Sequence, residues 1–267
     1  MRVLLTALTL LALAVPAVAQ TNVIITVVDK KSGEPFTDLR AADFSIAVGQ
    51  APRAVQACEY KQETIDIVLL LDSSLVGEQI SRLAPSLIRQ LDEHEQMSIV
   101  AYDNSAQVIQ EFTASQPILM DALQRIEFGN SPRLTDALYA TAADGFEGAT
   151  YRRVILLLTS GVDGPSSVKL EEVIRICRRN QVSVFPVHLL KFGRSRLMKI
   201  ARLTGGAPFS ATEITKRAGD PATTIFRAMR GHYELTVAGN LPLGDDAKIT
   251  IASHPKKKVF VSYMEME

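Results

Sequence analysis

A carboxylate and two hydroxyls follow one of the most apolar runs of the sequence, and they are its first candidates for chemistry. The run 65–71 leads directly to Asp72, which is followed by Ser73 and Ser74. A short run with a polar stop predicts a strand buried on both faces, as in a parallel sheet. Open α/β sheets bind ligands beyond the carboxyl ends of their strands, so we expect these residues at a binding edge. A simpler interpretation is that Asp72 and the serines cap the following helix, which is worth about 1 kcal/mol.

Two other predicted strands end in polar residues at the same edge. Tyr102, Asp103 and Asn104 follow the run 97–101, and Ser160 to Asp163 follow the run 154–159. The carboxyl ends of parallel strands lie at one edge of a sheet. These residues are therefore expected to form a polar rim suited to contact with a protein partner.

The residues that would indicate an enzyme do not form a catalytic motif. The sequence has no nucleophile elbow, phosphate-binding loop or dinucleotide-binding fingerprint after a predicted strand. Its four histidines are His94, His188, His232 and His254. His188 ends a predicted strand and could approach the rim as a general base, but a polar strand end with ordinary hydrogen bonds is the simpler interpretation. Neither cysteine has a nearby His or Cys at zinc-ligand spacing, and we expect no enzyme.

The first nineteen residues have the pattern of a secretory signal peptide. Arg2 precedes an apolar run, Pro16 interrupts it, and small residues predict cleavage after Ala19. We expect export to the periplasm or beyond the cell, without stable membrane insertion afterwards. Lys plus Arg and Asp plus Glu are 29 each, so no net charge attracts nucleic acid.

The two cysteines, Cys58 and Cys177, leave one alternative open. A disulfide is permitted in an exported protein. However, Cys177 lies on the apolar face of a predicted helix, where a small buried residue is the simpler interpretation.

Apolar strands alternate with amphipathic helices throughout residues 63–231. This alternation predicts an α/β fold with a doubly wound, mainly parallel sheet. Residues 20–62 and 232–267 contain short strands separated by turn residues instead. Three strands at each end are too few for two domains, so we expect them to pair in one small β-sandwich into which the α/β domain is inserted. Pro85 predicts an irregularity in the first helix.

Six segments resemble, in order, the blocks of the von Willebrand factor type A domain. They read DIVLLLDSS, MSIVAYDNSA, SPRLTDALYAT, RRVILLLTSGVDG, NQVSVFPVHL and IARLTGGAPF. The N- and C-terminal strands look like the flanks of an exported bacterial subfamily. The resemblance implies a Rossmann-like fold and a role in protein binding or adhesion.

The resemblance also implies a metal-ion-dependent adhesion site. In the family, an Asp-x-Ser-x-Ser motif, a Thr from a middle loop and an Asp after the fourth strand hold Mg²⁺. Oxygen ligands of this kind suit the cation, which keeps waters until a ligand replaces one. Asp72 and Ser74 match the first two positions, and they are the metal ligands that the resemblance assigns.

Three of the five expected donors are changed. Val76 stands at the third position, Pro132 at the Thr position with Ser131 beside it, and Ser160 at the last Asp position. A single carboxylate with hydroxyls offers Mg²⁺ little more than water does. We expect no cofactor, and Mg²⁺ only if Ser131, Ser160 or Asp163 reaches inward.

The sequence thus predicts an exported, non-enzymatic protein-binding or adhesion-type module with a degenerate metal-ion-dependent adhesion site. The predicted ligand-binding rim consists of Ser73, Tyr102, Asp103, Asn104, Ser131, Ser160 and Asp163. One alternative is Mg²⁺-dependent capture of an acidic side chain through an atypical site. Another is a structural or assembly subunit that pairs through its β flanks by strand addition.

Overall fold

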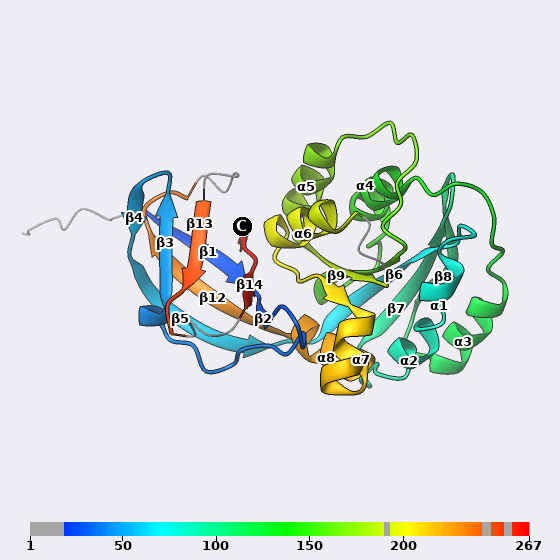
Figure 1. Ribbon diagram of the computed structural model, residues 1–267, viewed down its shortest axis with the longest axis horizontal. Helices are drawn as coiled ribbons and strands as arrows, with labels where there is room; N and C mark the ends of the chain where they lie inside the picture. The colour runs from blue at the N-terminus through cyan, green and yellow to red at the C-terminus, as the bar shows by residue number, and fades with distance from the viewer. Residues whose placement is uncertain (1–18, 190–192, 242–246, 254–257, 267) are drawn as a thin grey trace, which may run out of the picture.

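The chain forms two lobes that lie side by side, a β-sandwich and an α/β lobe (Figure 1). The computed structural model describes residues 19–189, 193–241, 247–253 and 258–266. The predicted signal peptide, residues 1–19, falls almost entirely outside the described residues. Across the described ranges, no helix is long and apolar enough to cross a membrane.

The α/β lobe is built on a six-stranded sheet in the order β11-β10-β9-β6-β7-β8. Its strands are β6 (Ile65–Asp72), β7 (Gln96–Tyr102), β8 (Ala106–Thr113), β9 (Arg152–Thr159), β10 (Val182–His188) and β11 (Phe209–Ser210). All neighbours are parallel except β7 and β8. The predicted fold class is therefore confirmed, and the antiparallel edge strand β8 is an addition that the sequence analysis missed.

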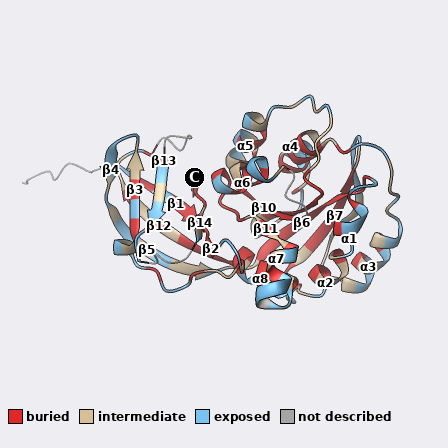
Figure 2. Cartoon of the chain, viewed as in Figure 1, coloured by how far each residue is buried: buried red, intermediate tan, exposed pale blue. Residues whose placement is uncertain are grey.

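Helices cover both faces of this sheet. One face carries α1 (Glu78–Ser81), α2 (Ala84–Ile88), α3 (Gln116–Gln124), α7 (Ala211–Ala218) and α8 (Pro221–Arg230), and the other carries α4 (Leu134–Asp144), α5 (Leu170–Arg179) and α6 (Arg194–Leu203). Successive side chains of a strand point to opposite faces. Leu69 and Leu71 therefore enter the first core and Leu70 the second, which explains the unbroken apolar run and the buried sheet in Figure 2. Pro85 lies in the first turn of α2, where the predicted helix is split in two.

The sandwich combines strands from both ends of the chain. Its four-stranded sheet has the order β15-β1-β12-β5, and smaller sheets have the orders β13-β3-β4 and β14-β2. The strands are β1 (Gln20–Ile25), β2 (Val27–Asp29), β3 (Phe44–Val48), β4 (Ala51–Arg53), β5 (Val55–Gln62), β12 (Gly231–Ala238), β13 (Ala247–Ile251), β14 (Val259–Val261) and β15 (Met264–Glu265), with a 3₁₀ turn at Ala41–Asp43. A third apolar core, including Val23, Ile25, Phe44 and Leu235, fills the space between the sheets.

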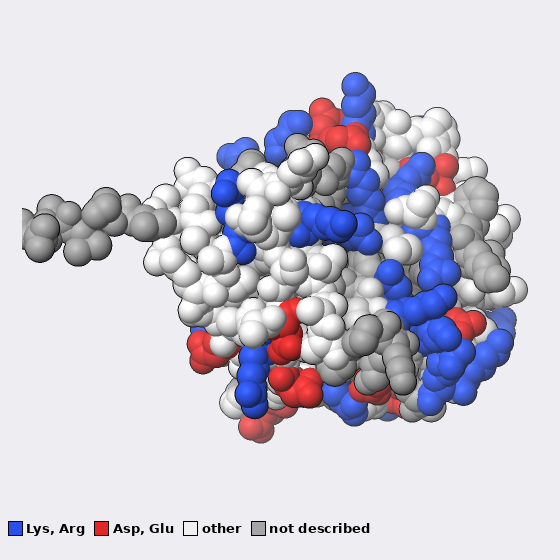
Figure 3. Space-filling view, turned by 60° about the vertical axis from the view of Figure 1, so that its left-hand side comes forward, with Lys and Arg blue, Asp and Glu red and all other residues white. Residues whose placement is uncertain are grey.

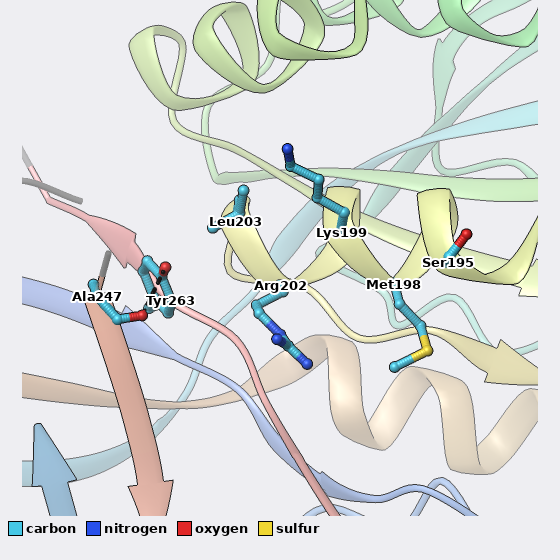
Figure 4. Close-up of a pocket in the computed structure, with 7 residues that line it drawn as sticks. All are labelled: Ser195, Met198, Lys199, Arg202, Leu203, Ala247 and Tyr263. Atoms are coloured by element: carbon cyan, nitrogen blue, oxygen red, sulfur yellow. Dashed lines mark hydrogen bonds between the residues drawn. The ribbon is translucent and has the colours of Figure 1, made fainter. Parts of the chain in front are cut away.

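Helices α5 and α6 join the lobes. Ile174 of α5 and Leu203 of α6 belong to the core of the sandwich. The N–H of Tyr263 donates to the carbonyl of Arg202 (2.8 Å), and a cavity of about 430 Å³ opens beside this contact (Figure 4). It is lined by Ser195, Met198, Lys199, Arg202, Leu203, Ala247 and Tyr263.

The two cysteines are both free. Cys177 is buried in the second core of the α/β lobe, whereas Cys58 lies on β5 against the core of the sandwich. Burial raises the pKa of Cys177 to about 12 and that of Cys58 to about 11. Both are therefore protonated, poorly reactive thiols at neutral pH.

Candidate functional site

The candidate site lies where the strand order of the α/β sheet reverses. From β6 the chain moves to β7 on one side and later returns to β9 on the other side. Asp72 ends β6, and Ser160 directly follows β9, so the two residues come from neighbouring parallel strands. The crevice at such a switch point is where open α/β sheets bind ligands.

Each oxygen of the Asp72 carboxylate accepts two hydrogen bonds. Oδ1 accepts from the backbone N–H of Ser74 (3.1 Å) and from its hydroxyl (2.5 Å). Oδ2 accepts from the backbone N–H of Ser160 (2.9 Å) and from its hydroxyl (2.6 Å). Asp72 and Ser74 are completely buried, and Ser160 is nearly so. A carboxylate has about four acceptor positions, so this one is fully occupied by donors of the protein itself.

The alternative in which Asp72 caps the following helix is wrong. Helix α1 begins at Glu78 with Gly77 as its N-cap, and no side chain in the described part of the chain caps it. The carboxylate instead closes a turn on the N–H of Ser74, two residues further along. A Cβ at Gly77 would lie 2.2 Å from the carbonyl oxygen of Asp72 and 2.5 Å from its Oδ1. The chain therefore packs directly on Asp72, and only glycine fits there.

The loop after β6 presents apolar side chains to solvent. Leu75 is 71% exposed and Val76 is 52% exposed. Pro132 is buried, and its carbonyl accepts from the N–H of Gly164 (2.6 Å), while Ser131 beside it is exposed. The third and fourth family donor positions, Val76 and Pro132, thus offer no side-chain oxygen.

A second buried carboxylate, Asp163, lies in the loop after β9 and is held by its own partners. Its Oδ2 accepts from the hydroxyl of Thr135 and from the guanidinium of Arg196, and its Oδ1 accepts from the hydroxyl of Ser166 (2.7 Å). Its side chain is only 6% exposed. Sequence reasoning missed Thr135 and Arg196, because a Thr beside Asp136 and an Arg in a predicted helix carry no distinguishing signal.

The other predicted rim residues divide into buried and accessible ones. Tyr102 is completely buried, and its hydroxyl donates to Thr159 Oγ1 (3.0 Å). Burial, followed by the charge of Asp72, raises its pKa well above the usual value. The prediction that Tyr102 contributes its side chain to the rim is wrong, because its ring is buried in the second core of the α/β lobe. Ser73 is also buried, and its N–H donates to the carbonyl of Tyr102 (2.8 Å).

Asp103 and Asn104 lie at the surface beside a polar recess. Asp103 is half-buried and accepts a hydrogen bond from the amide of Asn130 (2.7 Å), and Asn104 is exposed. The recess has a volume of about 310 Å³ and is lined by Ser73, Ala101, Asp103, Ser105, Gln107, Ile109, Arg125 and Glu127. His188, the one histidine expected near this edge, is buried.

Figure 3 shows Lys and Arg side chains gathered in several places on one face of the molecule. Lys30 of the sandwich has a lowered pKa, first because of partial burial and then because of Arg202, Arg194 and Lys258. Like charges on both lobes therefore lie close enough to repel, beside the cavity of Figure 4.

Comparisons with known proteins identify the α/β lobe. Residues 66–217 match a family model described as the von Willebrand factor type A domain. None of the curated proteins compared with the chain matches it.

Similar solved structures include proximal thread matrix protein 1 from the mussel byssus, in one case with a zinc-occupied MIDAS motif. That protein has a TM-score of 0.55 and 13% identity, over 69% of this chain and 50% of the mussel chain. BatB from Bacteroides thetaiotaomicron has a TM-score of 0.45 and 14% identity, over 58% of this chain and 100% of the BatB chain. The D319A mutant of the PilB minor pilin from Streptococcus sanguinis has a TM-score of 0.46 and 13% identity, over 63% of this chain and 62% of the pilin chain. The chain thus spans about half the mussel protein, and this likeness concerns the fold.

Proposed function

We propose that this chain, which belongs to the von Willebrand factor type A domain family, is an exported, non-enzymatic module that binds a protein partner without a metal ion. Domains of this family are usually interaction or adhesion modules. The proposed binding surface is the accessible rim, which we define as Leu75, Val76, Asp103, Asn104 and Ser131. The observation that carries the proposal is the Asp72 carboxylate, whose acceptor positions are all filled by Ser74 and Ser160.

The donor set does not fit Mg²⁺. The cation requires nearly octahedral oxygen ligands and gives up its waters reluctantly. Here the donors beside Asp72 are only the neutral hydroxyls of Ser74 and Ser160, and two of the remaining family positions, Val76 and Pro132, have no side-chain oxygen. Asp163, the other carboxylate in these loops, is engaged with Thr135 and Arg196. We therefore treat the site as a degenerate metal-ion-dependent adhesion site in which hydrogen bonds take the place of the ion.

The accessible rim suggests how a partner is held. Leu75 and Val76 are large exposed apolar residues on one loop, and the polar residues Asp103, Asn104 and Ser131 lie on the neighbouring loops. An apolar centre with a polar margin is the usual anatomy of a protein–protein interface. The expected partner therefore supplies an apolar patch rather than a carboxylate aimed at a cation.

Calorimetric titration of Mg²⁺ and Mn²⁺ tests the absence of metal binding. We compare the native protein with a variant in which Val76→Ser, Pro132→Thr and Ser160→Asp restore the family donors. The native protein should give no saturable heat, whereas the restored variant should bind about one equivalent. Saturable binding by the native protein that disappears in Ser74→Ala would overturn the metal-free proposal and favour the atypical Mg²⁺ site.

A second experiment tests the rim. Chemical cross-linking in EDTA to an envelope extract should give a discrete partner band with the native protein. Leu75→Asp and Val76→Asp should remove the band, whereas Val108→Asp, a matched exposed valine on β8 (49% exposed), should retain it. A band that survives both rim variants would contradict the rim.

The assembly alternative has one structural argument in its favour. Strand β5 ends the order of the four-stranded sheet and pairs with β12 on one side. Its residues are exposed or half-buried, so its other edge is a candidate for strand addition. Partner binding that is insensitive to the rim variants would direct attention to this edge.

A further inference from the structure

Three potential metal ligands meet where the chain crosses between the two lobes. Glu63 lies on the crossing from β5 to β6, and His232 and Glu234 lie on β12, directly after the return crossing from α8. The N–H of Glu63 donates to the carbonyl of Arg230 (3.0 Å), which holds the two crossings side by side. His232 and Glu234 are two residues apart on a strand, so their side chains share one face.

The three ligand atoms surround a common point. His232 Nε2 lies 3.7 Å from Glu63 Oε2 and 3.7 Å from Glu234 Oε1. All three atoms lie within 4.8 Å of one another. Ligand atoms about 2.1 Å from a tetrahedral zinc ion are about 3.4 Å apart. The two distances from His232 need an adjustment of only a few tenths of an ångström, and the two carboxylate oxygens lie at most 4.8 Å apart.

His232 provides the independent observation that points to a ligand. Its side chain is completely buried, and neither of its ring nitrogens has a hydrogen-bond partner among the residues that the structure describes. A buried polar group without a partner is rare and calls for an explanation such as an ion or a water molecule. Nε2 faces two carboxylates, each with an oxygen 3.7 Å away.

Burial and then the charges of Arg152 and Lys61 lower the pKa of His232, so the two carboxylates must outweigh these two cations for an ion to bind. Lys61 contacts the other oxygen of Glu234, Oε2 (2.6 Å), so Oε1 stays directed at His232. The Nε of Arg152 is 3.9 Å from Glu63, too far for a hydrogen bond. Glu63 and Glu234 also line a cavity of about 450 Å³, from which water can reach the site.

We propose that Glu63, His232 and Glu234 bind a zinc ion that fastens the two crossings between the lobes. One nitrogen and two carboxylate oxygens match the ligand types of zinc, and water from the cavity supplies the fourth position. The site is remote from Asp72 at the opposite end of β6, and it does not depend on the proposed function.

The test is zinc binding by the purified, EDTA-treated protein, measured by competition with a chromogenic chelator. The native protein should bind one equivalent, and zinc should raise its Tm. His232→Gln and Glu63→Gln should each weaken binding at least tenfold and remove the rise in Tm. His94→Gln, a matched histidine whose side chain is 70% exposed, should change neither.

Ser160→Ala separates this site from the Asp72 site and should also leave zinc binding intact. Glu63 is 38% exposed, so Glu63→Gln keeps the test available if the His232 variant does not fold. Absence of saturable binding by the native protein would overturn the proposal, since a trapped water would then satisfy His232. Binding that persists in Glu63→Gln and His232→Gln, or that is lost in Ser160→Ala, would overturn it as well.

Discussion

Replacement of Asp72 by alanine should reveal that this carboxylate stabilises the fold itself. The substitution leaves the buried N–H groups of Ser74 and Ser160 without an acceptor. Each buried, unsatisfied donor costs about 1–3 kcal/mol, so we expect the free energy of unfolding to fall by about 2–6 kcal/mol. The two serine hydroxyls can rotate towards other acceptors, and we leave them out of this sum.

The measurement is urea unfolding followed by circular dichroism, with EDTA or with Mg²⁺. An unchanged slope against urea would assign the loss to stability rather than to a different unfolded state. Asp121→Ala is the matched control, since that carboxylate is 81% exposed and only 4.0 Å from Arg125, and it should cost no more than about 0.5 kcal/mol. A cost of less than about 1 kcal/mol for Asp72→Ala in EDTA, together with stabilisation of the native protein by Mg²⁺, would contradict a structural role for this carboxylate.

Three further predictions concern single residues. Gly77→Ala should destabilise the fold by about 1–3 kcal/mol in urea unfolding, because the new Cβ overlaps Asp72; an unchanged midpoint would show that the loop can move away. Asp220→Ala removes the N-cap of α8 and should cost about 1 kcal/mol at pH 7. The Thr223 hydroxyl and then the α8 N–H groups lower the pKa of Asp220. Its contribution to stability is therefore present above the pKa of an unfolded Asp and is lost as the pH falls through the lowered pKa, so the native protein and the variant should converge in acid. Burial, followed by the charges of Arg152 and Lys61, lowers the pKa of His232 to about 3. In EDTA the unfolded chain therefore takes up this proton first, and the free energy of unfolding should decline by up to about 5 kcal/mol as the pH falls from about 6.5 to 3. Unfolding measured at several pH values should show a smaller decline in His232→Gln, and an equal decline would show that His232 is not the group responsible.

The fold could be predicted from the sequence because its strongest signals are local. The buried strand β6 is read directly from its apolar run, and the amphipathic pattern of α5 places Cys177 in the core. Strand β8 was missed because it is a half-exposed edge strand whose polar sequence lacks the apolar run of a buried strand. The period of a helix and the apolar run of a buried strand can both be read from a few consecutive residues. Whether a strand lies at the edge of a sheet depends on its neighbours in space, which the local sequence does not show.

The candidate site was predictable in position but not in detail. The strand ends placed Asp72 and Ser160 at one edge, yet only the structure shows them bonded to each other across 88 positions of sequence. Tyr102 was assigned to the rim because its neighbours in sequence are polar, but strand alternation directs it into the core. The cluster of Glu63, His232 and Glu234 was not predicted because Glu63 is far from the other two residues in the sequence. The His-x-Glu spacing within one strand is a signal that could have been used.

The arrangement of the sandwich has a consequence for the order in which the molecule is completed during synthesis. Strand β1 is made first, but both of its partners, β12 and β15, belong to the last part of the chain. The α/β lobe, by contrast, contains every strand of its sheet once residue 210 has been made. Pairings between distant segments form slowly, and an unpaired apolar edge invites association with other chains. The opening strand must therefore wait beside an already folded lobe, so changes that delay β12 should promote aggregation more than changes of equal energetic cost within the α/β core.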